Sequence, residues 1–349
     1  MAGQPIRHLR PPEITRRSNR VNRRERKVSN WILPWDNEEE IDVGILGCPY
    51  GRSASGSVGA DEAANTIRLA FPRFRTYDPY HDVDISFLKV RDLGEILEHA
   101  SGVVESHRHI AEAITDLLEC RKIKTLIIIG GDHSVTAPIM RGLTSANSTR
   151  RGGLVYFDAH ADATELLDGY PHNAPLRPIL EEGLVAGEDV IHIGMASFGN
   201  ALYYRRWLEG HHVTIIPQRE VHTRGIGDIM RQAREVAGER TDWTYVSLDI
   251  DVMGQEYAPA TGAGYPGGLG SLEILEAVEV VGQWSNLVAM DIVEVAPPLD
   301  LGLQTVKLAT SIMLHFLLGV ALRKENEDRR KEASVAMAQL GEESGAISP

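Results

Sequence analysis

Residues 154–165 read LVYFDAHADATE, an apolar run followed at once by ionisable side chains. The four apolar residues predict a short buried strand. Beyond them, Asp158, His160 and Asp162 occupy every second position. Because an extended chain directs every second side chain to the same side, these three can converge. The stretch therefore predicts a strand of a sheet whose end presents three potential metal ligands.

The same arrangement, a short apolar run and then an amphipathic stretch, repeats between about residues 41 and 320. Residues 101–122 carry apolar side chains at helical spacing, whereas the runs around 41–51, 124–134 and 244–252 are short and rich in β-branched residues. Strands that alternate with helices favour a mostly parallel sheet covered by helices on both faces. The expected fold class is therefore α/β.

Three more strand ends carry ionisable residues. The segments are GGDHS at 130–134, SLDID at 247–251 and DIVEVAP at 291–297. In parallel sheets, ligands bind beyond the carboxyl ends of the strands, so we expect these segments to share one edge with residues 158–162. The candidate metal ligands at this edge are two histidines and four aspartates, namely His133, Asp158, His160, Asp162, Asp249 and Asp251.

Four carboxylates gathered at one edge would repel one another and raise their pKa values unless cations neutralised them. A single DxHxD motif is weak, because loop capping or a calcium site explains it equally well, and GGDHS alone is explained by turn formation. All the motifs together, in this order and at strand ends, predict a metal centre. The ligands are oxygen and imidazole without thiolate, a set that suits Mn²⁺, with Ni²⁺, Co²⁺, Fe²⁺ and Zn²⁺ as alternatives.

The composition narrows the function classes. The 349 residues are 43% hydrophobic, enough for a full core, and the formal net charge is −13. This charge argues against nucleic acid or an anionic membrane as the main partner and weakly favours a cationic small molecule. Two cysteines without CxxC spacing, and no apolar run longer than that around residues 126–129, predict a soluble protein of the reducing cytoplasm.

Both ends of the chain differ from its middle. Residues 1–40 are rich in arginine and lack the apolar segment of a secretory signal. We expect them to form a basic N-terminal arm, exposed or clasping a neighbouring subunit, with an organelle transit peptide as the alternative. The expected division is this arm at 1–40, a catalytic domain at 41–325 and a charged C-terminal tail at 326–349.

The four motifs, together with GSVGADEAANTIR at 56–68, resemble the signature segments of the ureohydrolase family of arginase, agmatinase and formimidoylglutamase. The resemblance covers about residues 41–320, and four motifs in the same order are highly specific. It implies a three-layer α/β/α sandwich with a mostly parallel central sheet. Trimers or hexamers are usual in the family, so a homo-oligomer is expected, with a second kind of subunit as an alternative.

The resemblance also implies roles for individual residues. Two divalent metal ions per subunit would be held by overlapping sets of ligands, one by His133, Asp158, Asp162 and Asp249, the other by Asp158, His160, Asp249 and Asp251. Glu294 matches the glutamate that binds a guanidinium group. Asp162 would pass a proton from the nucleophile to the leaving amine, and His172 matches the family's proton-shuttle histidine.

The loop between His160 and His172 bears on the substrate. Its length is similar to that in agmatinase, and it lacks the Ser-x-Asn element of arginase, so the chain resembles the agmatinase and guanidino-compound branch. Asn173 stands where the family usually has glycine, and Gly254-Gln255 where most members have Asp-Pro. The resemblance implies a binuclear metal hydrolase that cleaves a guanidino compound to urea and an amine. The substrate would be agmatine, a guanidino acid, or a small guanidine or biguanide.

Other interpretations stay open. A formimidoyl or other amidine hydrolase would release formamide instead of urea. A non-catalytic partner subunit would keep the fold for assembly, although the complete set of ligands and Glu294 argues against this. A single-metal deacetylase of the same fold would not need both His133 and Asp251.

Overall fold

The structure is a computed structural model that describes residues 6–15, 17–18, 24–52, 59–99, 102–165 and 172–345. Three residues of the Gly-rich segment, 56–58, lie outside this part of the chain, as do residues 166–171 of the loop that bears on the substrate.

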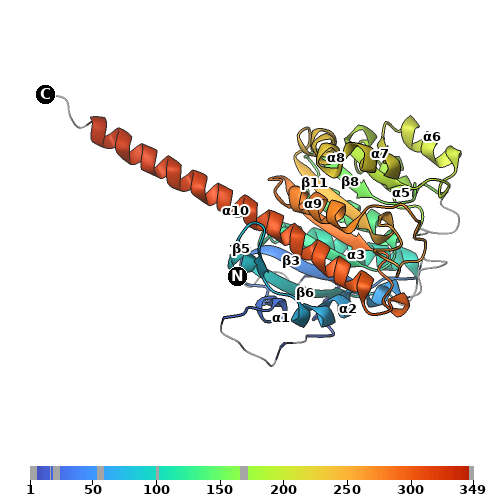
Figure 1. Ribbon diagram of the computed structural model, residues 1–349, viewed down its shortest axis with the longest axis horizontal. Coiled ribbons are helices and arrows are strands. Elements are labelled where there is room, and N and C mark those ends of the chain that lie inside the picture. Colours follow the sequence, from blue (N-terminus) through green and yellow to red (C-terminus); the bar gives the residue numbers. More distant parts are fainter. Residues whose placement is uncertain are drawn as a thin grey trace.

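A sheet forms the centre of the molecule (Figure 1). Its strands are β1 (Leu9–Arg10), β2 (Leu33–Pro34), β3 (Ile41–Cys48), β6 (Val90–Ile96), β7 (Ile123–Gly130), β8 (Gly152–Phe157), β9 (Val190–Met195), β10 (Thr214–Pro217), β11 (Trp243–Asp249) and β12 (Leu287–Val293). Their order is β1-β6-β3-β7-β12-β11-β8-β9-β10, and β2 pairs with β6. Within the described residues every pairing in this sheet is parallel except that of β1 with β6. A separate antiparallel pair joins β4 (Tyr77–Asp78) to β5 (Val83–Asp84).

The central strands are apolar on both sides because both faces of the sheet are covered. In β7, Ile127 and Ile129 belong to one hydrophobic core, whereas Leu126 and Ile128 belong to a second core on the opposite face. A strand buried on both faces carries a continuous apolar run instead of an alternating one. The two cores confirm the expectation drawn from the short runs of β-branched residues.

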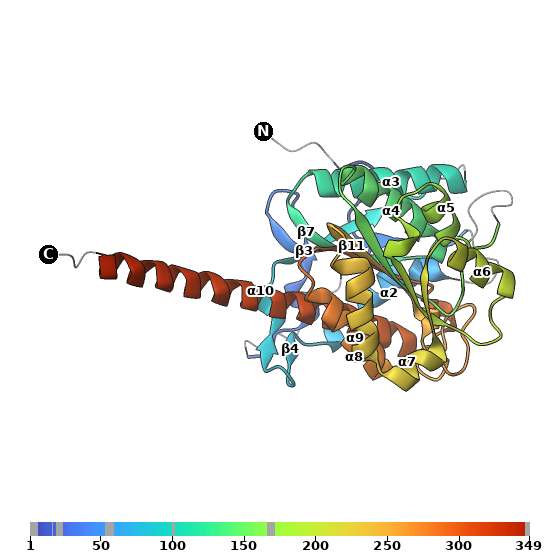
Figure 2. The ribbon, with the colours of Figure 1, turned by 90° about the horizontal axis from the view of Figure 1, so that it is seen from above.

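The helices form the two outer layers (Figure 2). On one face lie α3 (Val103–Glu119), α4 (Thr136–Ala146), α5 (Leu176–Glu181) and α6 (Leu202–Gly210). On the other lie α1 (Val28–Trp31), α2 (Ala63–Ala70), α7 (Gln218–Arg224), α8 (Ile226–Ala233), α9 (Ser271–Gly282) and the first part of α10 (Gln304–Gly345). The expected three-layer α/β/α sandwich is confirmed.

Helix α10 is longer and more apolar than the sequence analysis anticipated. By length and composition its Gln304–Glu332 part could cross a membrane, so the expectation that no such stretch exists was wrong. However, 67% of the apolar window is buried inside the fold, where residues such as Ile312 and Phe316 belong to the core. The helix then continues past the core and projects from the body (Figure 1). Residues 326–332 of this projection are exposed.

Both ends of the chain contribute elements to the fold, and the division into an arm at 1–40, a catalytic domain and a tail at 326–349 stays a prediction. Residues 9–10 and 33–34 add strands β1 and β2 to the sheet, and Val28 and Trp31 are buried. The expected start of the C-terminal tail at residue 326 falls inside the single helix α10.

Candidate metal centre

The strand order places the three ligand-bearing segments and the Glu294 segment at one edge of the sheet. His133 begins a 3₁₀ turn after β7, Asp158 directly follows β8, and Asp249 is the last residue of β11. Strand β11 pairs with β8 on one side and with β12 on the other, and β12 pairs with β7. Because all these pairings are parallel, the carboxyl ends of the strands meet, as the sequence analysis expected.

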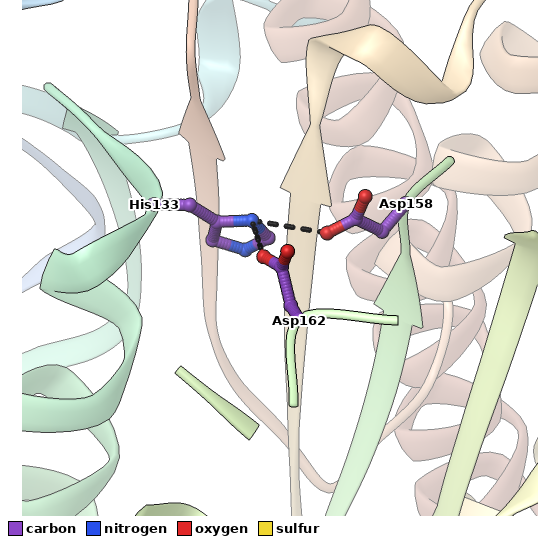
Figure 3. Close-up of side chains that lie close together, drawn as sticks. All are labelled: His133, Asp158 and Asp162. Atoms are coloured by element: carbon purple, nitrogen blue, oxygen red, sulfur yellow. Dashed lines mark ion pairs between the residues drawn. The ribbon is translucent and has the colours of Figure 1, made fainter. Parts of the chain in front are cut away.

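The first group of side chains surrounds His133. Its Nδ1 lies 3.1 Å from Asp158 Oδ2, 3.0 Å from Asp162 Oδ2 and 3.0 Å from Asp249 Oδ2. Figure 3 shows the Asp158 and Asp162 carboxylates, both from the segment that follows β8, directed at the His133 imidazole. His133, Asp158 and Asp162 are all buried and together could hold a metal ion.

A second group surrounds His160. Its Nδ1 lies 2.8 Å from Asp251 Oδ2 and 3.5 Å from Asp158 Oδ1. Asp158 therefore belongs to both groups and offers one carboxylate oxygen to each. Asp249 contacts the first group through Oδ2, whereas its Oδ1 accepts a hydrogen bond of 2.8 Å from the Asp251 backbone N–H. The structure thus brings all six predicted ligands together, and the bridging role of Asp249 stays a prediction.

The chemistry of these side chains fits divalent cations. Asp158 is fully buried, and its Oδ2 accepts no hydrogen bond, although a buried carboxylate oxygen normally does. Burial and the charges of Asp162 and Asp251 raise the pKa of Asp158 to about 7. Burial lowers the pKa of His160, but hydrogen bonds to Asp158 and Asp251 outweigh it and raise this pKa to about 12. A cation between the carboxylates would satisfy Asp158 Oδ2 and replace these protons.

Turns and unusual backbone angles hold the ligands in place. The Asp158 Oδ1 atom accepts a hydrogen bond of 2.6 Å from the His160 backbone N–H, and this bond stabilises a turn directly after β8. Asp162 has φ +44° and Glu294 has φ +60°, both in the left-handed region that residues other than glycine rarely adopt. Such backbone strain accumulates at functional sites because the surrounding structure must maintain it.

Gly131 has no side chain and so allows the Tyr50 backbone to approach it closely. A Cβ atom there would lie 1.7 Å from the Tyr50 carbonyl oxygen, far inside contact distance. The Gly131 carbonyl in turn accepts a hydrogen bond of 2.9 Å from the Glu294 backbone N–H. The GGDHS motif therefore needs its second glycine because the Tyr50 backbone leaves no room for a side chain at this position.

A cavity of about 340 Å³ opens over the two groups. Glu294 and His172 lie in its wall, with His172 Nδ1 3.5 Å from Glu294 Oε1. The Glu294 Oε1 atom also accepts a hydrogen bond of 2.8 Å from the His133 backbone N–H. Hydrogen bonding to Glu294 raises the pKa of His172 despite partial burial. The structure thus places both predicted catalytic residues beside the candidate metal ligands.

Further residues hold these ligands in position, and the sequence patterns did not indicate them. Ser247 Oγ lies 3.0 Å from His133 Nε2, which turns Nδ1 of the ring towards the carboxylates. Tyr156 donates a hydrogen bond of 2.9 Å from its hydroxyl to Asp162 Oδ2. Both residues stand two positions before a ligand, Ser247 before Asp249 at the end of β11 and Tyr156 before Asp158 directly after β8. The strand period that selected the ligands could therefore have found them, but Ser and Tyr inside apolar runs look like ordinary core residues.

Comparison with known proteins assigns the chain to a family. The model of the arginase family matches residues 41–319. The chain belongs to the arginase family. This arginase-family protein is 36% identical over 304 residues to the formimidoylglutamase of Halalkalibacterium halodurans, which covers 87% of this chain and 95% of that relative. It is 28% identical over 281 residues to the guanidinopropionase of Pseudomonas aeruginosa, covering 79% of this chain and 86% of that relative.

A solved structure agrees with these relatives. The crystal structure of formimidoylglutamase from Bacillus subtilis superposes with a TM-score of 0.83 at 30% identity, covering 87% of this chain and 95% of that chain. The arginase-family protein is accordingly a hydrolase that acts on C–N bonds of amidino groups.

Proposed function

We propose that this protein hydrolyses N-formimidoyl-L-glutamate to L-glutamate and formamide, at a centre that holds two divalent metal ions. The observation that carries this proposal is the similarity to formimidoylglutamase, 36% identity along 95% of the relative, in a chain whose six ligand candidates meet below one cavity. Of the functions that the sequence analysis considered, the comparisons support this alternative better than the release of urea.

The six ligand candidates would hold the two ions in overlapping sets, with Asp158 shared between them. When bound, the pair of cations supplies positive charge that lowers the pKa of a water molecule. We propose Mn²⁺ as the ion because oxygen ligands with a minority of imidazoles suit it, and Ni²⁺ as the alternative.

Glu294 would bind the substrate's amidinium group. Its carboxylate is buried in the cavity wall, and one oxygen is already fixed by the His133 backbone N–H. Charge-assisted hydrogen bonds from a planar N–H fork to a carboxylate are strong and directional, so they would orient the amidine carbon above the ligands.

His172 would donate the proton that the leaving nitrogen needs. Water adds its oxygen to the formimidoyl carbon, the bond from this carbon to the glutamate nitrogen breaks, and the nitrogen leaves as an amine. Because Glu294 raises the pKa of His172, the imidazole carries a proton more readily at neutral pH. Asp162, beside the same cavity, would hold the proton that the attacking water gives up.

A second candidate function is hydrolysis of a guanidino compound to urea and an amine. One observation favours it. Among the described residues that line the cavity there is no lysine or arginine, whereas Asp162, Asp249, Asp251 and Glu294 all contribute to its wall. Because these four acidic side chains are assigned to the metal ions and the amidinium group, the described lining offers no lysine or arginine to pair with the two carboxylates of a glutamate. The relatives also include a guanidinopropionase.

The two functions differ in their products. Protein stripped of metal and reloaded separately with Mn²⁺ or Ni²⁺ should be offered N-formimidoyl-L-glutamate, with glutamate and formamide as readouts. Guanidinopropionate, guanidinobutyrate, agmatine and arginine should be offered in parallel, with urea as the readout. We expect formamide. Urea without formamide would establish the second candidate, and neither product from protein with two bound ions would overturn both.

Two glutamate substitutions provide a matched pair of controls. Glu294→Gln removes the carboxylate that we assign to the amidinium group and should abolish turnover while both metal ions stay bound. Glu209→Gln changes an exposed glutamate on α6 that pairs with Arg205 and should leave turnover unchanged.

A further inference from the structure

Tyr156 occupies an unusual position for a core residue. It lies on β8, two residues before Asp158, and is fully buried. Its ring stacks on the His133 imidazole with centroids 4.9 Å apart and an interplanar angle of 7°. The ring also contacts His192, at a centroid distance of 5.3 Å and an interplanar angle of 40°. The phenol is thus in contact with two imidazoles, one of which belongs to the candidate metal centre.

The hydroxyl of Tyr156 reaches two ligand atoms of the first group and is the only part of the side chain that bonds to them. It donates to Asp162 Oδ2 at 2.9 Å and lies 3.2 Å from His133 Nδ1. These two atoms are 3.0 Å apart and are the same atoms that we assign to a metal ion. In the described part of the chain, no contact joins the hydroxyl to the His160 and Asp251 side chains of the second group.

We infer that Tyr156 is a positioning residue for one of the two metal ions, the one held by His133, Asp158 and Asp162. This inference rests on the proposed metal centre. A carboxylate that accepts a fixed hydrogen bond has fewer orientations, so less conformational freedom is lost when it binds a cation. Asp162 needs this restraint more than the other aspartates, because it lies past the end of the strand with φ +44°.

Packing alone does not account for the hydroxyl. A phenylalanine would fill the same space between His133 and His192, and Phe157 already packs in the core on the opposite face of β8. A purely structural role therefore predicts that loss of the hydroxyl changes stability and leaves metal binding alone. A positioning role predicts that it changes the affinity for one metal ion and not for the other.

The test is the number and affinity of bound Mn²⁺ ions in Tyr156→Phe, measured by calorimetric titration of metal-free protein and by metal analysis after dialysis. Wild-type protein should bind two ions. In Tyr156→Phe one ion should keep its affinity, and the other should bind about 10 to 100 times more weakly, the usual effect of losing an outer partner of a ligand. Unchanged affinity for both ions, or an equal loss for both, would overturn the inference.

Tyr245→Phe is the matched control. Tyr245 is equally buried, lies on the neighbouring strand β11 and donates its hydroxyl to Asp291, which is not a candidate ligand. It should bind both Mn²⁺ ions as the wild type does. If Tyr245→Phe also binds one Mn²⁺ ion more weakly, the loss of any buried hydroxyl near this edge of the sheet lowers metal affinity. The specific role of Tyr156 would then be refuted.

A second substitution covers a failure of Tyr156→Phe to fold, which circular dichroism of metal-free protein would reveal. Tyr156→His keeps a flat ring between the two imidazoles but is too short to reach Asp162, so it should show the same loss at one ion only. If the proposed metal centre itself is wrong, wild-type protein would bind no Mn²⁺ tightly. This result differs from a loss of affinity that is confined to the Tyr156 variants.

Discussion

The Asp158 Oδ2 atom lies 3.1 Å from His133 Nδ1 and accepts no hydrogen bond. The other oxygen of this carboxylate lies 3.5 Å from His160 Nδ1, so one side chain joins both groups of candidate ligands. We therefore expect Asp158→Asn to lose both metal ions and to reduce turnover by at least about 1,000-fold, whereas Asp251→Asn should lose one ion. Metal analysis of the purified variants checks this, and two bound ions in Asp158→Asn would refute the shared position.

The pH dependence of stability should reverse when metal is added. In metal-free protein the pKa of Asp158 is raised to about 7 and that of His160 from 6.5 to about 12. A group with a raised pKa stabilises the fold below its unfolded pKa, and this stability is lost as the pH rises through the folded value. Metal-free protein should therefore melt at a lower temperature as the pH increases above 6.5.

Bound metal requires the same groups to release their protons, so affinity should increase with pH. The rise in melting temperature caused by Mn²⁺ should accordingly become larger from about pH 6 to 9. Thermal unfolding with a chelator and with Mn²⁺ across this range measures both trends. If the difference in melting temperature between protein with Mn²⁺ and protein with chelator did not change with pH, the assignment of these side chains as ligands would be contradicted.

Glu294 should control the protonation of His172. Because the carboxylate raises the pKa of His172, Glu294→Gln should lower it, and NMR of the imidazole against pH can measure this shift in metal-loaded protein. His172→Asn should reduce kcat by about 100 to 10,000-fold, the usual contribution of a general acid, with both metal ions retained. Loss of metal ions from His172→Asn would show that His172 maintains the metal centre and would contradict a role in proton transfer alone.

Gly131→Ala should destabilise the protein strongly. The new Cβ would meet the Tyr50 carbonyl oxygen at 1.7 Å, and the Tyr50 carbonyl carbon and backbone nitrogen are also within 3 Å, so a flexible side chain cannot move aside to relieve the clash. We expect a loss of at least about 3 kcal/mol in the free energy of unfolding, measured by denaturant titration. Gly210→Ala is the control, because a Cβ there meets nothing within 4 Å at the end of α6. An equal effect in both variants would argue against the close approach.

Local pattern was sufficient to predict the layers and the ligands. The apolar runs of β7 and β8 are strands because their β-branched and aromatic residues favour extended chain, and both faces are covered. The period of two drew attention to Asp158, His160, Asp162, Asp249 and Asp251, and the rule that ligands gather at the carboxyl ends of parallel strands placed them on one edge. The expected extended geometry was wrong, because the chain turns after β8 and Asp251 lies in a 3₁₀ helix, so His160 and Asp162 belong to different groups. The resemblance of the motifs supplied His172 and Glu294, which the structure places beside these ligands.

The sequence by itself therefore determined the elements, the fold class and the ligand types, since each depends on residues near one another in the chain. Only the tertiary structure decided that β12 lies between β7 and β11, that Tyr156 reaches Asp162, and that Asp162 and Glu294 adopt left-handed backbone angles. It also decided that α10 is a core helix along its first part, despite being apolar enough to cross a membrane. The strand order and the burial of α10 depend on packing between segments far apart in the chain, and the Tyr156–Asp162 contact depends on the turn after β8. Local periodicity encodes neither.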